Sequence, residues 1–254
     1  MARRPTEEGA VIEIDRVPDT PIPKLLVTHG RGGTGKSTCV RILAERAQVA
    51  GRSVVIADAD RTNATLASFF SDVVRPDHPD DKTVTDWLDA LVNQQAELMA
   101  TVLLDMGGGD QVFKRFAQSI ELVTLLDQVG IMPVALHCIG PDIDDLSYLR
   151  DIEESLAFCP TQTILVLNEG LIKDGRLGEA AFTEVRADPV YLAALKRGAV
   201  ELVLPRLACM QEIVTRRLSF AAAEKTLTLT NKHRVSIWCR DVDKAIAPIS
   251  HWLP

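Results

Sequence analysis

The sequence predicts an α/β fold in which a mostly parallel, twisted sheet carries helices on both faces. Short continuous runs of Val, Ile and Leu alternate along the chain with segments of helical hydrophobic spacing. Strands without polar alternation are typical of a parallel sheet that is covered on both faces. A glycine-rich turn joins the first of these strands to the first helix. With 254 residues the chain is long enough for one large domain of this class.

The elements follow in order from the apolar runs and their punctuation. Gly51 is expected to end the first helix, and Pro160 to close a later one. Strands are expected at Lys24–Thr28, Ser53–Asp58, Thr101–Asp105, Ile131–Cys138, Gln162–Asn168 and Val200–Leu204. Helices are expected up to about Ala50, near Leu66–Phe70, at Thr85–Met99, from Gln111 to about Val129, at Asp142–Phe158, around Pro189–Arg197 and Pro205–Phe220, and near Val242–Trp252.

The chain divides into a tail and one domain. Residues 1–23 contain four prolines and mixed charges, and Val11–Ile14 within them could form a short edge strand. Residues 24–254 are expected to form the single domain, whose last part, residues 186–254, is the most basic.

Composition excludes several classes of protein. The chain is 46% hydrophobic and 25% charged, which is ordinary for a globular domain. No apolar run approaches the roughly 20 residues that span a bilayer, and the N-terminus lacks the apolar region of a signal peptide. The five cysteines are scattered and form no C-x-x-C pair. We therefore expect a cytoplasmic protein with reduced, mostly buried thiols.

Charge is unevenly distributed along the chain. From residue 186 onward eleven Lys or Arg face six Asp or Glu, a balance of +5, so the preceding residues carry −12 of the total of −7. A basic C-terminal third suits a polyanionic partner such as DNA, bound nonspecifically through its phosphates. Solvated helix faces explain the same distribution equally well, so both interpretations stay open.

The turn after the first strand matches the phosphate-binding pattern G-x-x-x-x-G-K-[ST] over residues 30–37 without a mismatch. Its glycines allow the backbone to turn tightly and to direct N–H groups inward, and the helix that follows adds the positive end of its dipole. Lys36 is placed to contact the β- and γ-phosphates, and the Ser37 hydroxyl is placed to bind Mg²⁺. The pattern in this setting predicts that the chain binds a nucleoside triphosphate.

Polar residues at three other strand ends complete the predicted site. Asp58-Ala59-Asp60, Asp105 and Asn168 each follow an apolar run, and ligands of parallel sheets lie at the carboxyl ends of the strands. Mg²⁺ takes few protein ligands, and a carboxylate after a buried strand is the expected one; we assign that position to Asp105. Gly108, three residues on, could offer its N–H to the γ-phosphate.

The motifs resemble those of one particular family. Residues 31–38, RGGTGKST, are similar to the deviant Walker A motif of the ParA/MinD-type ATPases, K-G-G-x-G-K-[ST]. Residues 54–66, VVIADADRTNATL, resemble that family's second motif, in which D-x-D precedes P-Q-G-N-A-T. The resemblance covers roughly residues 24–170, and 188–207 together with the glycines after Asp105 look like plasmid-stability, StbB-type members.

This resemblance implies a P-loop fold and a Mg²⁺-dependent ATPase switch that cycles between ATP and ADP. Such proteins pair face to face through bound ATP, hydrolyse it slowly and position plasmids, chromosomes or other cargo with an adaptor protein. It implies that Lys36 contacts the phosphates, Ser37 the Mg²⁺ and Thr38 the α-phosphate, and that Asp60 positions the attacking water and lies at the metal. Asp105 supports the metal, and Asn168 resembles the adenine-binding asparagine. The phosphate loop itself comprises Gly32, Gly33, Thr34, Gly35, Lys36, Ser37 and Thr38.

Two departures from the family pattern bear on the mechanism. The family's signature lysine, which reaches the partner's phosphates, is Arg31 here. Arginine keeps the charge and has a planar fork that suits phosphate, so a catalytic role in trans is expected of Arg31, with a solvent-facing arginine as the alternative. The segment after Asp60 is one residue shorter than D-P-Q-G-N, which leaves its geometry open.

The same residues also allow other functions. A P-loop small-molecule kinase or an ATP-dependent ligase could use Asp60 to accept a hydroxyl proton, but no acceptor-site motif is recognisable. A binding module without turnover conflicts with the presence of Lys36, Asp60 and Asp105. The segment Val242–Trp252 contains a proline and one basic residue, which disfavours membrane anchoring. Trp252 is expected to pack on the body of the protein.

Overall fold

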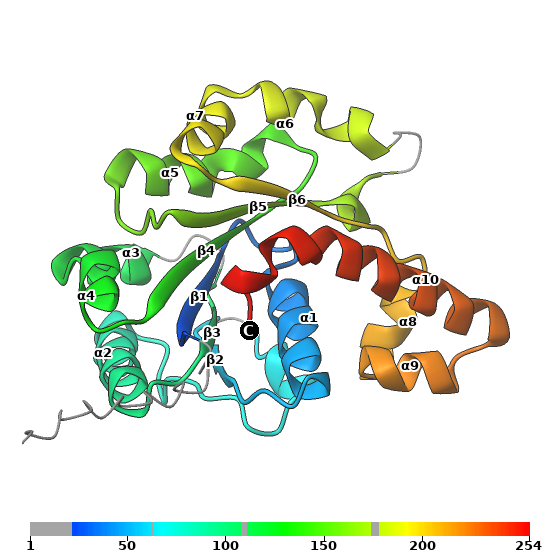
Figure 1. Cartoon of the computed structure of the whole chain (residues 1–254), viewed down its shortest axis with the longest axis horizontal. Helices are drawn as coiled ribbons and strands as arrows, with labels where there is room; N and C mark the ends of the chain where they lie inside the picture. Colours follow the sequence, from blue (N-terminus) through cyan, green and yellow to red (C-terminus); the bar gives the residue numbers. More distant parts are fainter. Residues whose placement is uncertain (1–21, 62, 108–110, 174–177) are drawn as a thin grey trace, which may run out of the picture.

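Six parallel strands form one sheet in the order β2-β3-β1-β4-β5-β6 (Figure 1). The computed structural model describes residues 22–61, 63–107, 111–173 and 178–254, so the expected strand at Val11–Ile14 lies outside them. The predicted α/β fold with a parallel sheet is confirmed. The strands are β1 (Lys24–His29), β2 (Val55–Asp58), β3 (Val102–Asp105), β4 (Met132–Ile139), β5 (Gln162–Asn168) and β6 (Val200–Leu204).

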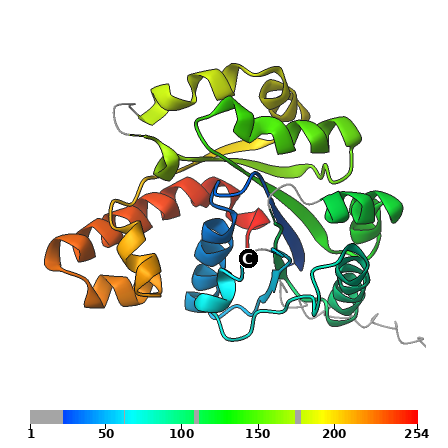
Figure 2. The same ribbon diagram turned by 180° about the vertical axis from the view of Figure 1, so that it is seen from behind.

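Helices cover both faces of the sheet, as the continuous apolar strands predict (Figures 1 and 2). Successive residues of a strand point to opposite faces, so Leu25 and Leu26 of β1 join two different core clusters. Leu26 packs with α1 (Lys36–Val49) and the C-terminal helices, whereas Leu25 packs on the side of α2. The helices of the second face are α2 (Asp81–Leu98), α3 (Gln111–Ser119), α4 (Leu122–Gln128), α5 (Ser147–Ser155), α6 (Thr183–Ala187) and α7 (Pro189–Arg197).

Three C-terminal helices form a unit, here called the C-terminal arm, that extends sideways from the sheet (Figures 1 and 2). The arm consists of α8 (Met210–Thr215), α9 (Phe220–Thr226) and α10 (Leu229–Ile246). Phe220 and Trp238 pack with ring centroids 4.8 Å apart, and both side chains belong to the core cluster around α1. The arm is therefore joined to the phosphate-loop helix through an apolar contact.

Several helix boundaries differ from the prediction. The expected helix from residue 111 to 129 is two helices, because Glu121 adopts a left-handed backbone with φ 47°. Leu156, at φ 51°, ends α5 before Phe158. The last long helix begins at Leu229 rather than near Val242, and η5 (Ala247–Trp252) is a 3-10 turn. The remaining 3-10 turns are η1 (Leu66–Ser68), η2 (Ile143–Leu146), η3 (Glu169–Leu171) and η4 (Gly178–Phe182).

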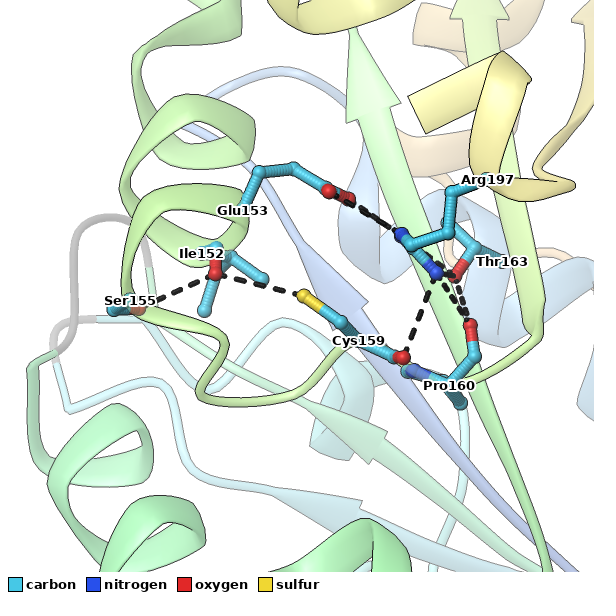
Figure 3. Close-up of polar contacts among 7 residues, drawn as sticks. All are labelled: Ile152, Glu153, Ser155, Cys159, Pro160, Thr163 and Arg197. Atoms are coloured by element: carbon cyan, nitrogen blue, oxygen red, sulfur yellow. Dashed lines mark hydrogen bonds and ion pairs between the residues drawn. The ribbon is translucent and has the colours of Figure 1, made fainter. Parts of the chain in front are cut away.

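An arginine at the end of α7 fastens that helix to α5 and to the loop before β5 (Figure 3). The Arg197 guanidinium donates to Glu153 of α5 at 2.5 Å and to the Pro160 carbonyl oxygen at 2.8 Å. Two longer contacts of 3.4 Å reach the hydroxyl of Thr163. This cluster lies at the amino end of β5, at the opposite end of that strand from Asn168.

The five cysteines are free, as expected, and three of them are buried. Within the described residues no helix is both long and apolar enough to cross a membrane. Leu253 is buried and Trp252 packs against the same core cluster, so the chain end lies on the body as predicted.

Candidate functional site

Three glycines of the loop between β1 and α1, including Gly33 at φ 83°, have a backbone that other residues rarely adopt, and two of them also lack room for a side chain. Gly30 and Gly35 have φ values of 137° and 103°, which strain any other residue. A Cβ atom on Gly30 would lie 2.5 Å from the Cys138 carbonyl oxygen, and one on Gly35 would lie 2.4 Å from Nδ2 of Asn168. The loop is therefore packed closely against the ends of β4 and β5.

Lys36, the first residue of α1, lies across this loop. Its Nζ donates to the carbonyl oxygens of Gly30 and Arg31, each at 3.0 Å, and the side chain is buried. These contacts use two of the three N–H donors of the ammonium group. The positive charge is thus held under the loop, at the N-terminus of α1, where the helix dipole adds to it.

A carboxylate at the end of β3 accepts hydrogen bonds from two hydroxyl groups. The Ser37 hydroxyl donates to Asp105 Oδ2 at 2.5 Å, and the Thr28 hydroxyl donates to Oδ1 at 2.9 Å. Burial raises the pKa of Asp105 above the usual carboxyl value, whereas the two hydrogen bonds and the charge of Lys36 lower it. Ser37 of the phosphate loop and Asp105 of β3 are both predicted to bind the metal, and the structure places them in direct contact.

The end of β2 brings a second pair of carboxylates to the same edge of the sheet. Asp58 is fully buried, and its Oδ1 accepts the backbone N–H of Asp60 at 2.9 Å. Asp60 Oδ1 in turn accepts the backbone N–H of Asn63 at 3.0 Å, which closes the turn. Gly107, two residues after Asp105, packs against Asp60, because a Cβ atom there would lie 3.5 Å from the Asp60 Cα. Asp60 thus lies between the ends of β2 and β3.

These side chains fit a hard divalent cation. A hydroxyl and carboxylates are the oxygen donors that Mg²⁺ prefers, and Ser37, Asp60 and Asp105 supply them at adjoining strand and helix ends. Among the described residues no group of three or more His, Cys, Asp or Glu is arranged to hold a metal by itself. A metal here would therefore complete its shell with water and substrate oxygens.

Asn168 supports the phosphate loop from the end of β5. Its Nδ2 donates to the Thr34 carbonyl oxygen at 2.9 Å, and its Oδ1 accepts the Gly170 N–H at 2.9 Å. The Thr34 hydroxyl donates to the Arg31 carbonyl oxygen at 2.8 Å, which tightens the turn further. Both ends of the Asn168 amide thus have a protein partner, and a contact of this residue with a base stays a prediction.

The remaining predicted residues lie around the mouth of the loop. Arg31, Gly32 and Gly33 are exposed at its tip, and Thr38 is half-buried in the first turn of α1. The Arg31 guanidinium lies 3.5 Å from Asp145 in η2 of the same chain, and half of its side-chain surface is exposed. Gly108, expected to contact the γ-phosphate, lies outside the described residues.

Two site residues carry no signal in the sequence. Thr28 is an ordinary strand residue until the parallel pairing with Asp105 places its hydroxyl on that carboxylate. Arg75 begins a proline- and aspartate-rich segment, yet its guanidinium contacts both Asp58 and Asp60. Only the hydrogen bonds of the folded chain identify them.

No family model matches this sequence, and no curated protein matches it. Solved structures do match its fold. It is similar to the MinD cell division protein of Aquifex aeolicus, with a TM-score of 0.51 at 13% identity over 89% of this chain and 97% of that one. It is similar to the MinD of Pyrococcus horikoshii in complex with Mg-ADP, with a TM-score of 0.51 at 18% identity over 89% and 98% of the two chains.

A further match is FtsY from Mycoplasma mycoides, with a TM-score of 0.44 at 17% identity over 71% of this chain. The chain spans 60% of the length of that FtsY structure. The two MinD matches confirm the predicted fold, which this chain shares with those structures over 89% of its length.

Proposed function

We propose that this protein is an ATP-operated molecular switch. It binds ATP with Mg²⁺ in the loop of residues 30–37, hydrolyses it slowly, pairs with a second copy through the bound ATP, and positions or partitions cargo such as plasmid DNA. The observation that carries the proposal is the direct contact between Ser37 and Asp105, with Asp60 at the adjacent strand end. These groups join a hydroxyl, two carboxylates and the cation of Lys36 at one edge of the sheet.

In this proposal, different residues bind the phosphates, hold the metal and orient the attacking water. The loop N–H groups and Lys36 bind the phosphates, because they present donors and positive charge at the start of α1. Ser37 and Asp105 would hold Mg²⁺, which neutralises charge on the phosphate oxygens when bound. Asp60 would orient the attacking water, since its carboxylate is fixed beside Gly107. The Mg-ADP in the matching MinD structure supports this choice of ligand.

Pairing through ATP would use the exposed tip of the loop. Arg31 is half exposed and not enclosed by its own chain, so its guanidinium can turn toward a second copy placed against the loop. A cation supplied in trans to the transferred phosphate contributes about 10³–10⁵ in rate in other phosphoryl-transfer proteins. Arg31 would act in this way, in place of the family's lysine.

The C-terminal arm supports a nonspecific contact with DNA. Two clusters of basic residues lie on this arm. Arg216 and Arg217 follow α8, and His233 and Arg234 lie exposed on α10. Binding through phosphates would weaken steeply with salt, by about 0.9 decades in affinity per decade of salt for each phosphate neutralised. An adaptor or cargo protein would act on the same switch.

Two measurements test the proposal. Light scattering gives the molar mass with ADP and with ATP–Mg²⁺, and we expect a dimer with ATP only. Lys36→Ala should weaken ATP binding by on the order of 10²-fold, because truncating a buried charge partner typically costs 2–5 kcal/mol. Lys82→Ala, which removes a lysine that is 84% exposed on α2, is the matched control.

The outcomes separate the candidate functions. Unchanged ATP affinity in Lys36→Ala would refute the phosphate-loop assignment. A monomer under all conditions, with ATP still bound, would remove the pairing mechanism and favour a kinase or ligase. A product other than ADP and phosphate would then identify the acceptor.

A further inference from the structure

Arg75 connects the Asp58 carboxylate to the backbone of Asp60 at the end of β2. Its guanidinium donates to the Asp58 Oδ2 atom at 3.1 Å and to the Asp60 carbonyl oxygen at 2.6 Å. About a quarter of the Arg75 side chain is exposed, whereas Asp58 is 1% exposed. The arginine thus closes the edge of the site, with its charged end directed inward.

The backbone fixes where this guanidinium lies. Val74, the residue before Arg75, continues the sheet beyond β2 through a parallel bridge to Ala57. The Asp58 N–H donates to the Val74 carbonyl oxygen at 2.9 Å, and the Val74 N–H donates to the Ile56 carbonyl oxygen at 2.9 Å. Arg75 is therefore anchored by regular hydrogen bonds rather than placed by a free loop.

The contacts of Arg75 complete a closed set around Asp60. The Asp60 N–H is bonded to the Asp58 carboxylate, its carbonyl oxygen to Arg75, and its own carboxylate to the Asn63 N–H. Because Arg75 also bonds Asp58, the three residues form a ring in which each holds the other two. Removing Arg75 opens this ring at two points.

The charge of Arg75 also compensates for the burial of the Asp58 carboxylate, which is 1% exposed. A buried carboxylate that loses its cation is strongly disfavoured. Arg75 therefore supplies both a hydrogen bond and the positive charge that faces Asp58.

We propose that Arg75 is a positioning residue for hydrolysis: through the Asp58 carboxylate and the Asp60 carbonyl it fixes the turn that directs Asp60 toward the phosphate loop. This inference rests on the proposed role of Asp60.

The experiment compares Arg75→Gln, Arg75→Lys and the control Arg115→Gln. Arg115 is 61% exposed and pairs with Asp81 on the surface, so its variant removes an arginine ion pair without touching the ring. Steady-state ATP hydrolysis and ATP dissociation constants are measured for each, alone and combined with Asp60→Ala. Amide hydrogen exchange of Asp60 and Asn63 is followed by NMR without nucleotide.

We expect Arg75→Gln to lower kcat by about tenfold or more and to change ATP affinity by less than about twofold, since only an interaction needed for the reacting geometry is lost. Exchange at Asp60 and Asn63 should accelerate, with the amides of β1 and β3 unchanged. Arg75→Lys should be intermediate, because an ammonium lacks the planar fork that reaches both acceptors. In the Asp60→Ala background Arg75→Gln should have no further effect.

Exchange distinguishes this inference from the proposed function. If the wild type does not hydrolyse ATP, the proposed function fails. Faster exchange in Arg75→Gln would still show that Arg75 stabilises the ring with Asp58 and Asp60. Unchanged amide exchange at Asp60 in Arg75→Gln would show that Arg75 does not hold the ring, even if the enzyme is active. Faster exchange with unchanged kcat, or an equal loss of kcat in the Asp60→Ala background, overturns the role in positioning.

Discussion

The central carbon of the Arg41 guanidinium lies 4.0 Å from the centre of the Phe69 ring. The same carbon lies 4.1 Å from the centre of the Phe220 ring, so two aromatic rings contact the cation. Phe69 follows η1, Arg41 lies in α1 and Phe220 begins α9, so one side chain joins three distant parts of the chain. Arg41 also donates to Glu45 at 2.7 Å and to the Leu218 carbonyl oxygen at 2.5 Å.

Arg41→Ala should lower the free energy of unfolding by about 3 kcal/mol, because it removes a buried cation and leaves the Glu45 carboxylate, which is only 12% exposed, without its partner. Arg41→Met with Glu45→Gln should cost less, since it keeps the packing and removes the unpaired charge. Urea unfolding followed by circular dichroism measures both. A loss of under about 1 kcal/mol in Arg41→Ala would show that the enclosed cation does not support the arm.

Two buried histidines give stability a definite dependence on pH. His29 and His137 are neighbours across β1 and β4, with ring centroids 5.0 Å apart, and Tyr148 stacks on His29. In the described part of the chain, none of the four imidazole nitrogens has a hydrogen-bond partner. Burial lowers the pKa of both residues, that of His137 to about 3; the charges of Lys36 and Arg197 add to the effect.

Because these folded-state pKa values lie below the unfolded value of 6.5, the unfolded chain takes up protons first as the pH falls. Stability is therefore complete above about pH 6.5 and should decline below it, by up to about 1.4 kcal/mol per pH unit for each histidine. Asp58 and Asp105 oppose this trend, since burial raises their pKa values and protonation favours the folded state.

The test is the difference between wild type and His137→Leu, in which the carboxylate contributions cancel. Among urea midpoints at pH 7.5, 6.0 and 5.0, the midpoint of the wild type should fall more steeply with decreasing pH than that of the variant, because the variant has one histidine fewer to protonate. Parallel pH profiles of the two proteins would contradict the assignment of the slope to His137.

The glycines of the phosphate loop differ sharply in what they tolerate. Gly35→Ala should cost about 1–3 kcal/mol of stability and abolish nucleotide binding, because it combines a φ of 103° with a Cβ 2.4 Å from Asn168. Gly32→Ala is the matched control for stability, since its Cβ would meet nothing within 4 Å. Thermal unfolding of both variants decides the point: equal melting temperatures would show that the loop relaxes without cost.

Much of the fold could be predicted because its signals are local. The strands are continuous apolar runs, and the phosphate loop is a fixed pattern between a strand and a helix. The helix boundaries at Glu121 and Leu156 could not be predicted, since neither residue is the glycine or asparagine that usually adopts a left-handed backbone. The start of α10 had a usable signal, the spacing of Val235, Trp238 and Val242.

The candidate site shows the same division between local and long-range information. Lys36, Ser37 and Asp105 belong to motifs whose spacing places them, and the structure brings them together. Arg75 and Arg41 belong to none. Arg41 finds its carbonyl partner 177 residues away, and no periodicity or motif encodes such a pair. Sequence patterns therefore predict the binding groups better than the residues that hold them.

The guanidinium of Arg31 contacts Asp145 of its own chain before any second copy approaches. Gly140 makes room for that carboxylate, because a Cβ there would lie 2.3 Å from Asp145 Oδ2. The contact with Arg31 is 3.5 Å long and Arg31 is half exposed, so the pair contributes at most about 1 kcal/mol. Under the proposed function, Arg31 must leave Asp145 to reach the partner's phosphates.

Asp145→Asn should therefore tighten ATP-dependent dimerisation by up to about fivefold, the equivalent of 1 kcal/mol, whereas Arg31→Ala should abolish it. Asp144→Asn removes the same charge from the exposed side of η2 and controls for net charge. Sedimentation at several protein concentrations in ATP–Mg²⁺ gives the dimerisation constants. Should Arg31→Ala dimerise as the wild type does, the arginine does not replace the signature lysine, and release from Asp145 has no bearing on pairing.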